Sequence, residues 1–193
     1  MFQEDINIKL EKKGIRKELI TKLKSLDQKY RKEASEAILR EIVKQKDYLL
    51  AGTIFIYVGT ENEVDTTLII KDALAKGKKV VVPKTIELGL MEACEIDSME
   101  DLQPGRHDIL EPMNATYKLD PEKIDVAYIP CVAYTRVGYR LGYGGGFYDR
   151  FLLRGKFKRV LLAFSEMEVE RLPVDFFDEK VHAILNEKGY TEI

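Results

Sequence analysis

Cysteines and long apolar runs are scarce in this sequence of 193 residues. Cys94 and Cys131 lie far apart and show no metal-ligand spacing, so we expect two buried, reduced thiols rather than a disulfide or a nucleophile. The first residues contain no signal-peptide apolar core, and no apolar run reaches the length that spans a bilayer. The sequence therefore predicts a cytoplasmic protein that does not engage a membrane.

An excess of positive charge is also missing. The chain has 31 Lys and Arg against 33 Asp and Glu, a net charge of −2, so it presents no overall basic field to a nucleic acid. Glu33, Glu36 and Glu41 interrupt the basic surface that begins at the N-terminus. We expect no nucleic-acid partner, and any bound anion must be held by a local cluster. The length and the 45% apolar content suit one domain over residues 1–193.

The apolar pattern predicts alternating helices and strands. Two charged, amphipathic helices are expected at the N-terminus, the second beginning after Asp27, from two stripes at helical spacing: Ile15, Leu19, Leu23 and Leu26, then Tyr30, Ala34, Ile38 and Ile42. Further helices are expected at 65–77 and from Phe147 onward. Apolar runs predict strands at 53–58, 78–82, 90–96, 125–135 and 159–165, with an edge strand at 182–187. Pro83 is expected to end the second strand and Pro130 to bend the fourth, while 102–112 is expected to form an irregular loop. This alternation favours an α/β fold with a mostly parallel sheet and helices on its faces.

The stretch RLGYGGGFYDR, residues 140–150, holds four of the thirteen glycines. Such a cluster marks a tight turn or a backbone that closely approaches a ligand. A glycine-rich turn that leads from a strand into a helix exposes successive N–H groups at a positive helix end, which suits a phosphate. Arg136, Arg140 and Arg150 flank the loop as possible phosphate donors, and Asp149 can face a metal ion. The alternative is a structural turn with solvated arginines. The spacing is neither GxGxxG nor GxxxxGK[ST], so a Rossmann or Walker-type site is unsupported.

The glycine motif, entered from IPCVAYTRVGY, resembles the signature of the 5-formyltetrahydrofolate cyclo-ligase family, also called methenyltetrahydrofolate synthetase. Four other segments resemble this family in the same order along the chain: KKGIRKEL, IFIYVGTENEVDT, GRHDILEP and LPVDFFDEKVHAI. The resemblance covers nearly the whole chain. It implies a three-layer α/β/α fold, with the expected helical pair at the N-terminus. It also implies an enzyme that uses ATP and Mg²⁺ to convert 5-formyltetrahydrofolate to 5,10-methenyltetrahydrofolate, releasing ADP and phosphate. We expect a monomer or a weak homodimer.

The resemblance also implies roles for individual residues. Arg140 and Tyr148 match catalytic positions. The ATP-binding positions are Lys12, Arg16, Arg140, Leu141, Gly142, Tyr143, Gly144, Gly145, Gly146, Phe147 and Tyr148. The folate-binding positions are Val58, Glu63, Tyr143, Gly144, Gly145, Gly146 and Phe147. The magnesium carboxylates are Asp149 and Asp178.

Several of these roles have simpler alternatives. Lys12 and Arg16 share one helical face and can converge on one anion, but either can belong to a solvated face; Lys13 points about 100° away. Asp149 or Glu63 can cap a helix, Asp178 can be a loop acid, and Phe147 can simply pack. The chain lacks a basic residue that some relatives carry within the glycine loop, so Arg136 or Arg150 is expected to take over its charge.

Three other functions compete with this assignment. Sugar-phosphate isomerases and coenzyme A transferases of similar architecture use a carboxylate and no ATP, and here only Glu63 or Glu111 can be argued for that carboxylate. A non-catalytic nucleotide- or folate-binding module would bind ligands without turnover. A nucleic-acid binder that uses the basic first helix is disfavoured by the acidic balance. ATP binding and product formation separate these possibilities.

Overall fold

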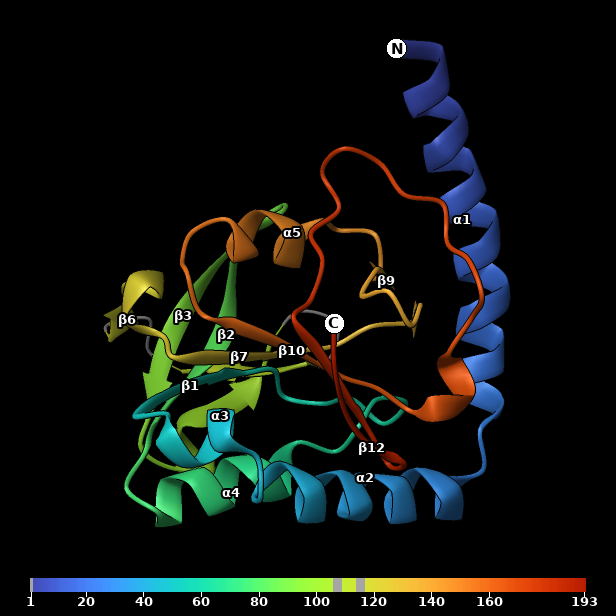
Figure 1. Cartoon of the computed structure of the whole chain (residues 1–193). Coiled ribbons are helices and arrows are strands. Elements are labelled where there is room, and N and C mark those ends of the chain that lie inside the picture. The colour runs from blue at the N-terminus through green and yellow to red at the C-terminus, as the bar shows by residue number, and fades with distance from the viewer. Residues whose placement is uncertain (1, 106–108, 114–116) are drawn as a thin grey trace.

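A central sheet of eight strands organises the computed structural model, which describes residues 2–105, 109–113 and 117–193 (Figure 1). The strand order is β12-β11-β10-β7-β1-β2-β3-β6. The strands are β1 (Thr53–Ile56), β2 (Lys79–Glu87), β3 (Leu90–Ile96), β6 (Lys118–Leu119), β7 (Val126–Ile129), β10 (Lys158–Leu162), β11 (Ala183–Asn186) and β12 (Gly189–Glu192). The five strands from β11 to β2 pair in parallel, whereas β12, β3 and β6 join antiparallel. The prediction of a mixed α/β fold with a mostly parallel sheet is confirmed.

Helices cover both faces of the sheet, because its central strands are apolar on both sides. In β1, Ile54 and Ile56 join the core under α2 (Gln28–Ile42) and α4 (Thr67–Ala75), whereas Phe55 faces the second core under α5 (Phe147–Leu152). Phe55 stacks on Phe151 of α5 with ring centroids 4.5 Å apart. The remaining helical segments are α3 (Lys46–Leu50), η1 (Met99–Asp101), η3 (Pro121–Lys123) and η4 (Ser165–Met167). No helix in the described ranges is long and apolar enough to cross a membrane.

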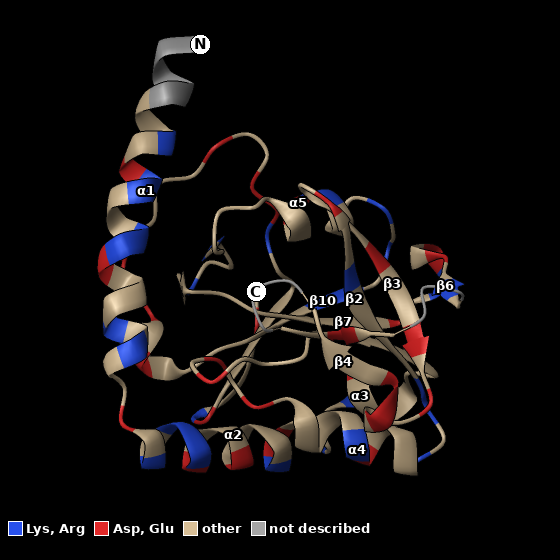
Figure 2. Cartoon of the chain, turned by 180° about the vertical axis from the view of Figure 1, so that it is seen from behind, with Lys and Arg blue, Asp and Glu red and all other residues tan. Residues whose placement is uncertain are grey.

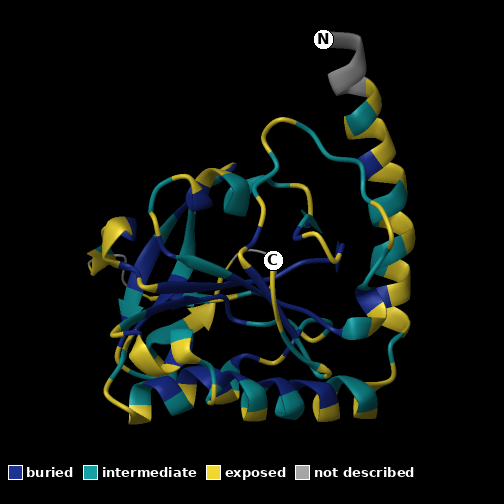
Figure 3. Ribbon diagram, viewed as in Figure 1, coloured by how far each residue is buried: buried dark blue, intermediate teal, exposed yellow. Residues whose placement is uncertain are grey.

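The first helix, α1 (Phe2–Ser25), stands beside the sheet rather than on either face (Figure 1). Its lower part reaches the core through Leu23, with Leu19 and Leu26 partly buried beside it. Most of the helix beyond is exposed or half-buried (Figure 3). The helix ends at Ser25, and Asp27 caps α2 by accepting a hydrogen bond from Tyr30 N at 3.0 Å. The expected pair of N-terminal helices is present.

The structure corrects several expected boundaries. Strand β2 continues through Pro83 to Glu87, because Pro83 lies where β2 pairs with β3 on one side only and the core strand β1 has already ended. The 183–186 strand is internal, since β12 pairs with its outer side. The segment at 102–112 is not wholly irregular: β4 (Leu102–Pro104) and β5 (Leu110–Pro112) form a small antiparallel sheet. Residues 106–108, which include His107, lie outside the described residues.

Candidate active site

The candidate site lies at the carboxyl ends of the central strands. The parallel strands run 11-10-7-1-2 across the sheet, so the chain moves from β1 to β2 on one side and returns with β7 on the other. Ligands of open α/β sheets bind at such a switch point, between the segments that leave the two diverging strands. Here these segments are the turn that contains Glu63, after β1, and the glycine loop, after β7. The topology alone therefore brings the two main predicted regions together.

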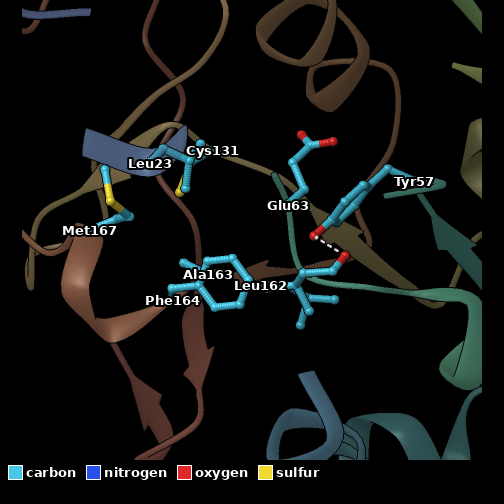
Figure 4. A pocket seen from close by; sticks show the side chains of 9 residues that line it. Leu23, Tyr57, Glu63, Cys131, Leu162, Ala163, Phe164 and Met167 are labelled. Carbon is cyan, nitrogen blue, oxygen red and sulfur yellow. Dashed lines mark hydrogen bonds between the residues drawn. The ribbon is translucent and has the colours of Figure 1, made fainter. Parts of the chain in front are cut away.

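A small cavity opens at this switch point, beside the ends of β1, β7 and β10 (Figure 4). Most of its lining is apolar, and Glu63 and the Tyr57 hydroxyl supply polar groups. The lining residues are Leu23, Tyr57, Glu63, Val64, Cys131, Leu162, Ala163, Phe164 and Met167. Apolar walls with a few polar groups are typical of small-molecule sites. Both cysteines of the chain are buried, and burial raises the pKa of the Cys131 thiol, which leaves it in the neutral form.

Glu63 is held in a tight turn and does not cap a helix. Its Oε2 accepts hydrogen bonds from Thr60 N at 2.9 Å and Thr60 Oγ1 at 2.7 Å. The start of α4 is bound instead by Asp65, whose Oδ1 accepts from Thr67 N at 2.9 Å. Burial raises the pKa of the Glu63 carboxyl, although the hydrogen bonds from Thr60 oppose this shift. A half-buried carboxylate beside this cavity can pair with N–H donors of a ligand.

The glycine loop follows a separate two-stranded sheet, β8 (Ala133–Tyr134) and β9 (Arg140–Leu141), which forms after the chain leaves β7 at Pro130. Gly144 has φ +100° and Gly146 has φ +65°, conformations that L side chains rarely adopt. A Cβ on Gly145 would lie 2.5 Å from the Phe147 ring. Three of the four glycines are therefore required by backbone conformation or by close packing.

Arg16 reaches across from α1 to this loop. Its Nε donates to Gly142 O at 2.7 Å, and its guanidinium carbon would lie 3.2 Å from a Cβ on Gly144. A groove between α1 and the loop is lined by Arg16 and Tyr143 together with five further residues of α1: Lys13, Lys17, Ile20, Thr21 and Lys24. Among the described residues, four cations and no acid line this groove, so it attracts anions; Lys and Arg of α1 are blue in Figure 2. Lys13, expected to be the poorer candidate, in fact shares the groove with Arg16.

Arg140 and Asp149 contact each other. The Arg140 side chain is 4% exposed; its Nη2 donates to Asp149 Oδ1 at 2.9 Å and its Nη1 to Glu179 O at 2.9 Å. Asp149 lies in the first turn of α5, whose N-cap is Gly146, and its Oδ1 also accepts from Glu179 N at 3.4 Å. Asp149 is therefore not the N-cap of α5. It links the glycine loop to the segment that carries Asp178.

Lys12 is turned toward a different pair of acids. Its Nζ lies 2.7 Å from Asp175 Oδ2 and 2.5 Å from Asp178 Oδ2. These acids belong to the segment 168–182, which runs alongside α1 (Figure 1). Lys12 and Arg16 thus lie on one face of α1, as expected, but Lys12 contacts the 168–182 segment and Arg16 contacts the glycine loop. The alternative of a fully solvated charge is excluded for both residues.

The remaining predicted residues occupy varied positions. Tyr148 lies edge-on to Phe55. Burial is the main cause that raises the pKa of Tyr148; the charge of Glu63 adds to the shift, and that of Arg140 opposes it. Leu141 is buried in β9, and Phe147 packs partly against the α5 core. Val58 is buried in the core beneath α2 and α4, so its side chain points away from the groove.

The two arginines expected to replace a missing loop cation are engaged elsewhere. Arg136 is 85% exposed and pairs with Glu168. Arg150 donates from Nε to Gly89 O at 2.6 Å and from Nη2 to Gly145 O at 2.5 Å, which ties the β2–β3 turn to the glycine loop. The cations that line the groove beside the loop come from α1 instead.

Asp149 and Asp178 each keep one carboxylate oxygen that could take part in a magnesium shell. Asp149 accepts hydrogen bonds through Oδ1, and Asp178 accepts them through Oδ2. Within the described part of the chain, Asp149 Oδ2 and Asp178 Oδ1 accept none. The described residues contain no cluster of three or more potential protein ligands. Magnesium usually takes one or two carboxylates and completes its shell with water and phosphate oxygens, which is what this arrangement permits.

Sequence reasoning missed Lys17, Lys24 and Asp175. Lys13, Lys17 and Lys24 are spaced i, i+4 and i+11, so they share one helical face, and Arg16 borders it. This spacing alone contains the signal for the groove. Asp175 has no comparable signal, because its role depends on how the 168–182 segment lies against α1.

The structure has a glycine-rich loop beside a groove lined by cations, and an apolar cavity with a few polar groups at the switch point of a mostly parallel sheet. These features are typical of α/β enzymes that bind small ligands. The model of the 5-formyltetrahydrofolate cyclo-ligase family matches residues 8–187, and the chain belongs to this family. The mouse 5-formyltetrahydrofolate cyclo-ligase is 28% identical over 200 residues, covering 94% of this chain and 96% of its own. The enzyme of the same name from Escherichia coli K12 is 27% identical, covering 84% of this chain and 92% of its own.

A solved structure supports the same relationship. The NMR structure of Aquifex aeolicus 5,10-methenyltetrahydrofolate synthetase superposes with a TM-score of 0.82 and 31% identity, covering 94% of this chain and 92% of that one. The family predicted from the glycine motif and its flanking segments is therefore confirmed.

Proposed function

We propose that this chain catalyses the ATP- and magnesium-dependent conversion of 5-formyltetrahydrofolate to 5,10-methenyltetrahydrofolate, with release of ADP and phosphate. Family membership supports the overall reaction. The observation that carries the proposal is the meeting of the glycine loop, the α1 cations and the half-buried Glu63 at one switch point of the sheet. One ligand with a phosphate chain and another with a polar ring can be held there side by side.

The chemistry requires an activated formyl oxygen. Nitrogen 10 of the folate cannot close the ring onto the formyl carbon while oxide is the leaving group. If the formyl oxygen attacks the γ-phosphorus, ADP leaves and the formyl carbon becomes an iminium-like centre that bears a phosphate. Nitrogen 10 then attacks this carbon, phosphate departs with the formyl oxygen, and nitrogen 10 loses its proton. The protein is required to align the two ligands and to stabilise phosphate charge.

The phosphates would lie between the glycine loop and α1. Backbone N–H groups of Gly142 and Gly144–Gly146 would face the phosphate oxygens, and Lys12, Arg16 and Arg140 would neutralise their charge. Leu141 holds the start of the loop in β9. Bound magnesium would lower the charge repulsion between phosphate oxygens, and the free oxygens of Asp149 and Asp178 would hold it.

The folate would occupy the cavity beside the loop. Glu63 would accept hydrogen bonds from the pterin amino and ring N–H groups, and Val58 would close the inner wall beneath it. Tyr143 and Phe147 would contact the folate rings at the loop, and Tyr148 would lie beside the reacting formyl group, within the field of Glu63 and Arg140.

An absorbance assay tests this function. The purified protein is mixed with 5-formyltetrahydrofolate and magnesium, and the near-ultraviolet band of the methenyl product is followed before and after ATP is added. We expect the band to grow only after ATP addition. A flat trace from folded protein would contradict the proposal, and an ATP-binding titration would then separate a silent binding module from an isomerase-like enzyme.

A further inference from the structure

Lys12 is an unusual residue in this protein. It is 9% exposed and lies against two acids at once. A buried ammonium is costly unless it is paired. Lys12 has two carboxylates within 2.7 Å, Asp175 and Asp178, so the cluster of three carries one more negative than positive charge.

Asp175 is bound more extensively than pairing with Lys12 requires. Its Oδ1 accepts from Phe177 N at 2.8 Å, and its own N–H donates to Asp178 Oδ2 at 2.7 Å. Asp178 N in turn donates to Asp175 O at 3.2 Å. Asp175 therefore fixes both the Lys12 ammonium and the Asp178 carboxylate, although it matches no family position assigned above.

The two neighbours of Asp175 have conflicting tasks when a nucleotide binds. A magnesium ion at Asp178 and the Lys12 ammonium compete for the same carboxylate, since each is stabilised by its negative charge. With only one acid in the cluster, Lys12 would lose its carboxylate partner whenever Asp178 turned to the metal, and no carboxylate would hold its ammonium in place for the phosphates. The second acid removes this conflict, because Lys12 keeps a partner at 2.7 Å while Asp178 turns to the metal.

We infer that Asp175 is a positioning residue for the nucleotide site: it holds Lys12 in place so that Asp178 is free for magnesium. This inference rests on the proposed function. It assigns to Asp175 no contact with either substrate. It explains why two acids surround one lysine at the junction between α1 and the 168–182 segment.

The test compares Asp175→Asn with the wild-type protein. Asparagine keeps the size and the Oδ1 acceptor for Phe177 N, so the turn is retained while the charge is lost. We expect the magnesium concentration for half-maximal activity to rise about fivefold, and the affinity for Mg·ATP, measured by calorimetry without folate, to fall by a similar factor. Glu170→Gln removes a charge from the same segment, where Glu170 is 91% exposed and pairs weakly with Arg171, and should change neither quantity.

A double-mutant cycle shows whether Asp175 acts through Lys12. In a Lys12→Met background, Asp175→Asn should change the magnesium requirement by about twofold or less. This small remaining effect comes from the Asp175 charge acting on the metal through solvent. A fivefold shift that persists in this background would overturn the inference, as would an unchanged magnesium requirement in the single variant. If the wild-type protein forms no product, the proposed function fails. The calorimetric comparison still decides the inference, and equal Mg·ATP affinities would overturn it.

Discussion

Arg140 donates a hydrogen bond to Asp149 at 2.9 Å, so the residue proposed to clamp phosphate holds the residue proposed to bind magnesium. The same guanidinium donates to Glu179 O, and Glu179 N donates to Asp149. The glycine loop and the 168–182 segment are therefore joined through charged groups. A substitution at either residue changes the partner of the other, and the effects on stability and catalysis have to be separated.

Replacing Arg140 by alanine should affect both properties. The substitution leaves Asp149 and Glu179 O without their main donor, and we expect the free energy of unfolding to fall by about 1.5–3 kcal/mol. Turnover should fall at least tenfold, because phosphate loses a charged donor. Denaturant unfolding and the absorbance assay measure the two effects. Arg136→Ala is the matched control, since Arg136 is exposed and engages only Glu168 in a surface pair. Equal activity of the two variants would remove Arg140 from the site.

Asp149→Asn should weaken the response to magnesium. Asparagine can still accept from Arg140, so the fold should survive, but the neutral amide is a poorer ligand for a divalent ion. We expect the magnesium concentration for half-maximal activity to rise about tenfold, equivalent to ~1.4 kcal/mol, with a lower maximal rate. A magnesium titration at fixed ATP measures both. A normal titration curve would leave Asp149 with a structural role only.

Glu63 should make stability depend on pH. Burial raises its pKa in the folded protein above the ordinary value of 4.5, so the folded state holds the proton more tightly than the unfolded state does. The free energy of unfolding contributed by this group should therefore fall as pH rises from about 4.5 through the folded pKa, and then level off. Urea unfolding of the wild-type and Glu63→Gln proteins across this range isolates the effect. The wild-type curve should fall relative to the variant, and parallel curves would contradict the assignment.

Gly144→Ala should disturb nucleotide binding more than folding. A Cβ at φ +100° is strained by about 1–2 kcal/mol and would lie 3.2 Å from the Arg16 guanidinium, which must then shift slightly against the loop. We expect the Michaelis constant for ATP to rise several-fold. Gly14→Ala, on open α1 surface, should stabilise the protein by about 0.5–1 kcal/mol and serves as the control. An unchanged Michaelis constant in the Gly144 variant would show that the loop tolerates a side chain there.

The elements with strong local signals were predictable. The strand that the run TIFIYV predicts is β1, which ends at Ile56 and contributes to both cores. The glycine cluster keeps its positive-φ residues where a turn requires them. The short strands β6 and β12 were missed, because two to four residues with mixed polarity carry no periodicity. The prediction that Pro83 ends the second strand was wrong. Proline is excluded from a strand that pairs on both sides, but it is tolerated where the strand pairs on one side only.

The site was predictable as a set of residues but not as a network. The motifs identified Lys12, Arg16, Arg140, Asp149 and Asp178, yet not that Lys12 pairs with Asp178 or Arg140 with Asp149. The Lys12–Asp178 contact joins residues 166 positions apart, and it depends on α1 lying against the 168–182 segment. No local pattern records that placement, so Asp175 could be identified only from the structure.

Transfer of an oxygen isotope tests the central claim most directly. The proposed chemistry sends the formyl oxygen of 5-formyltetrahydrofolate into the released phosphate. With substrate carrying ¹⁸O in the formyl group, mass spectrometry of the phosphate should find one ¹⁸O for each methenyl product formed. Unlabelled phosphate, with the ¹⁸O recovered in water, would contradict phosphorylation of the formyl oxygen at this site.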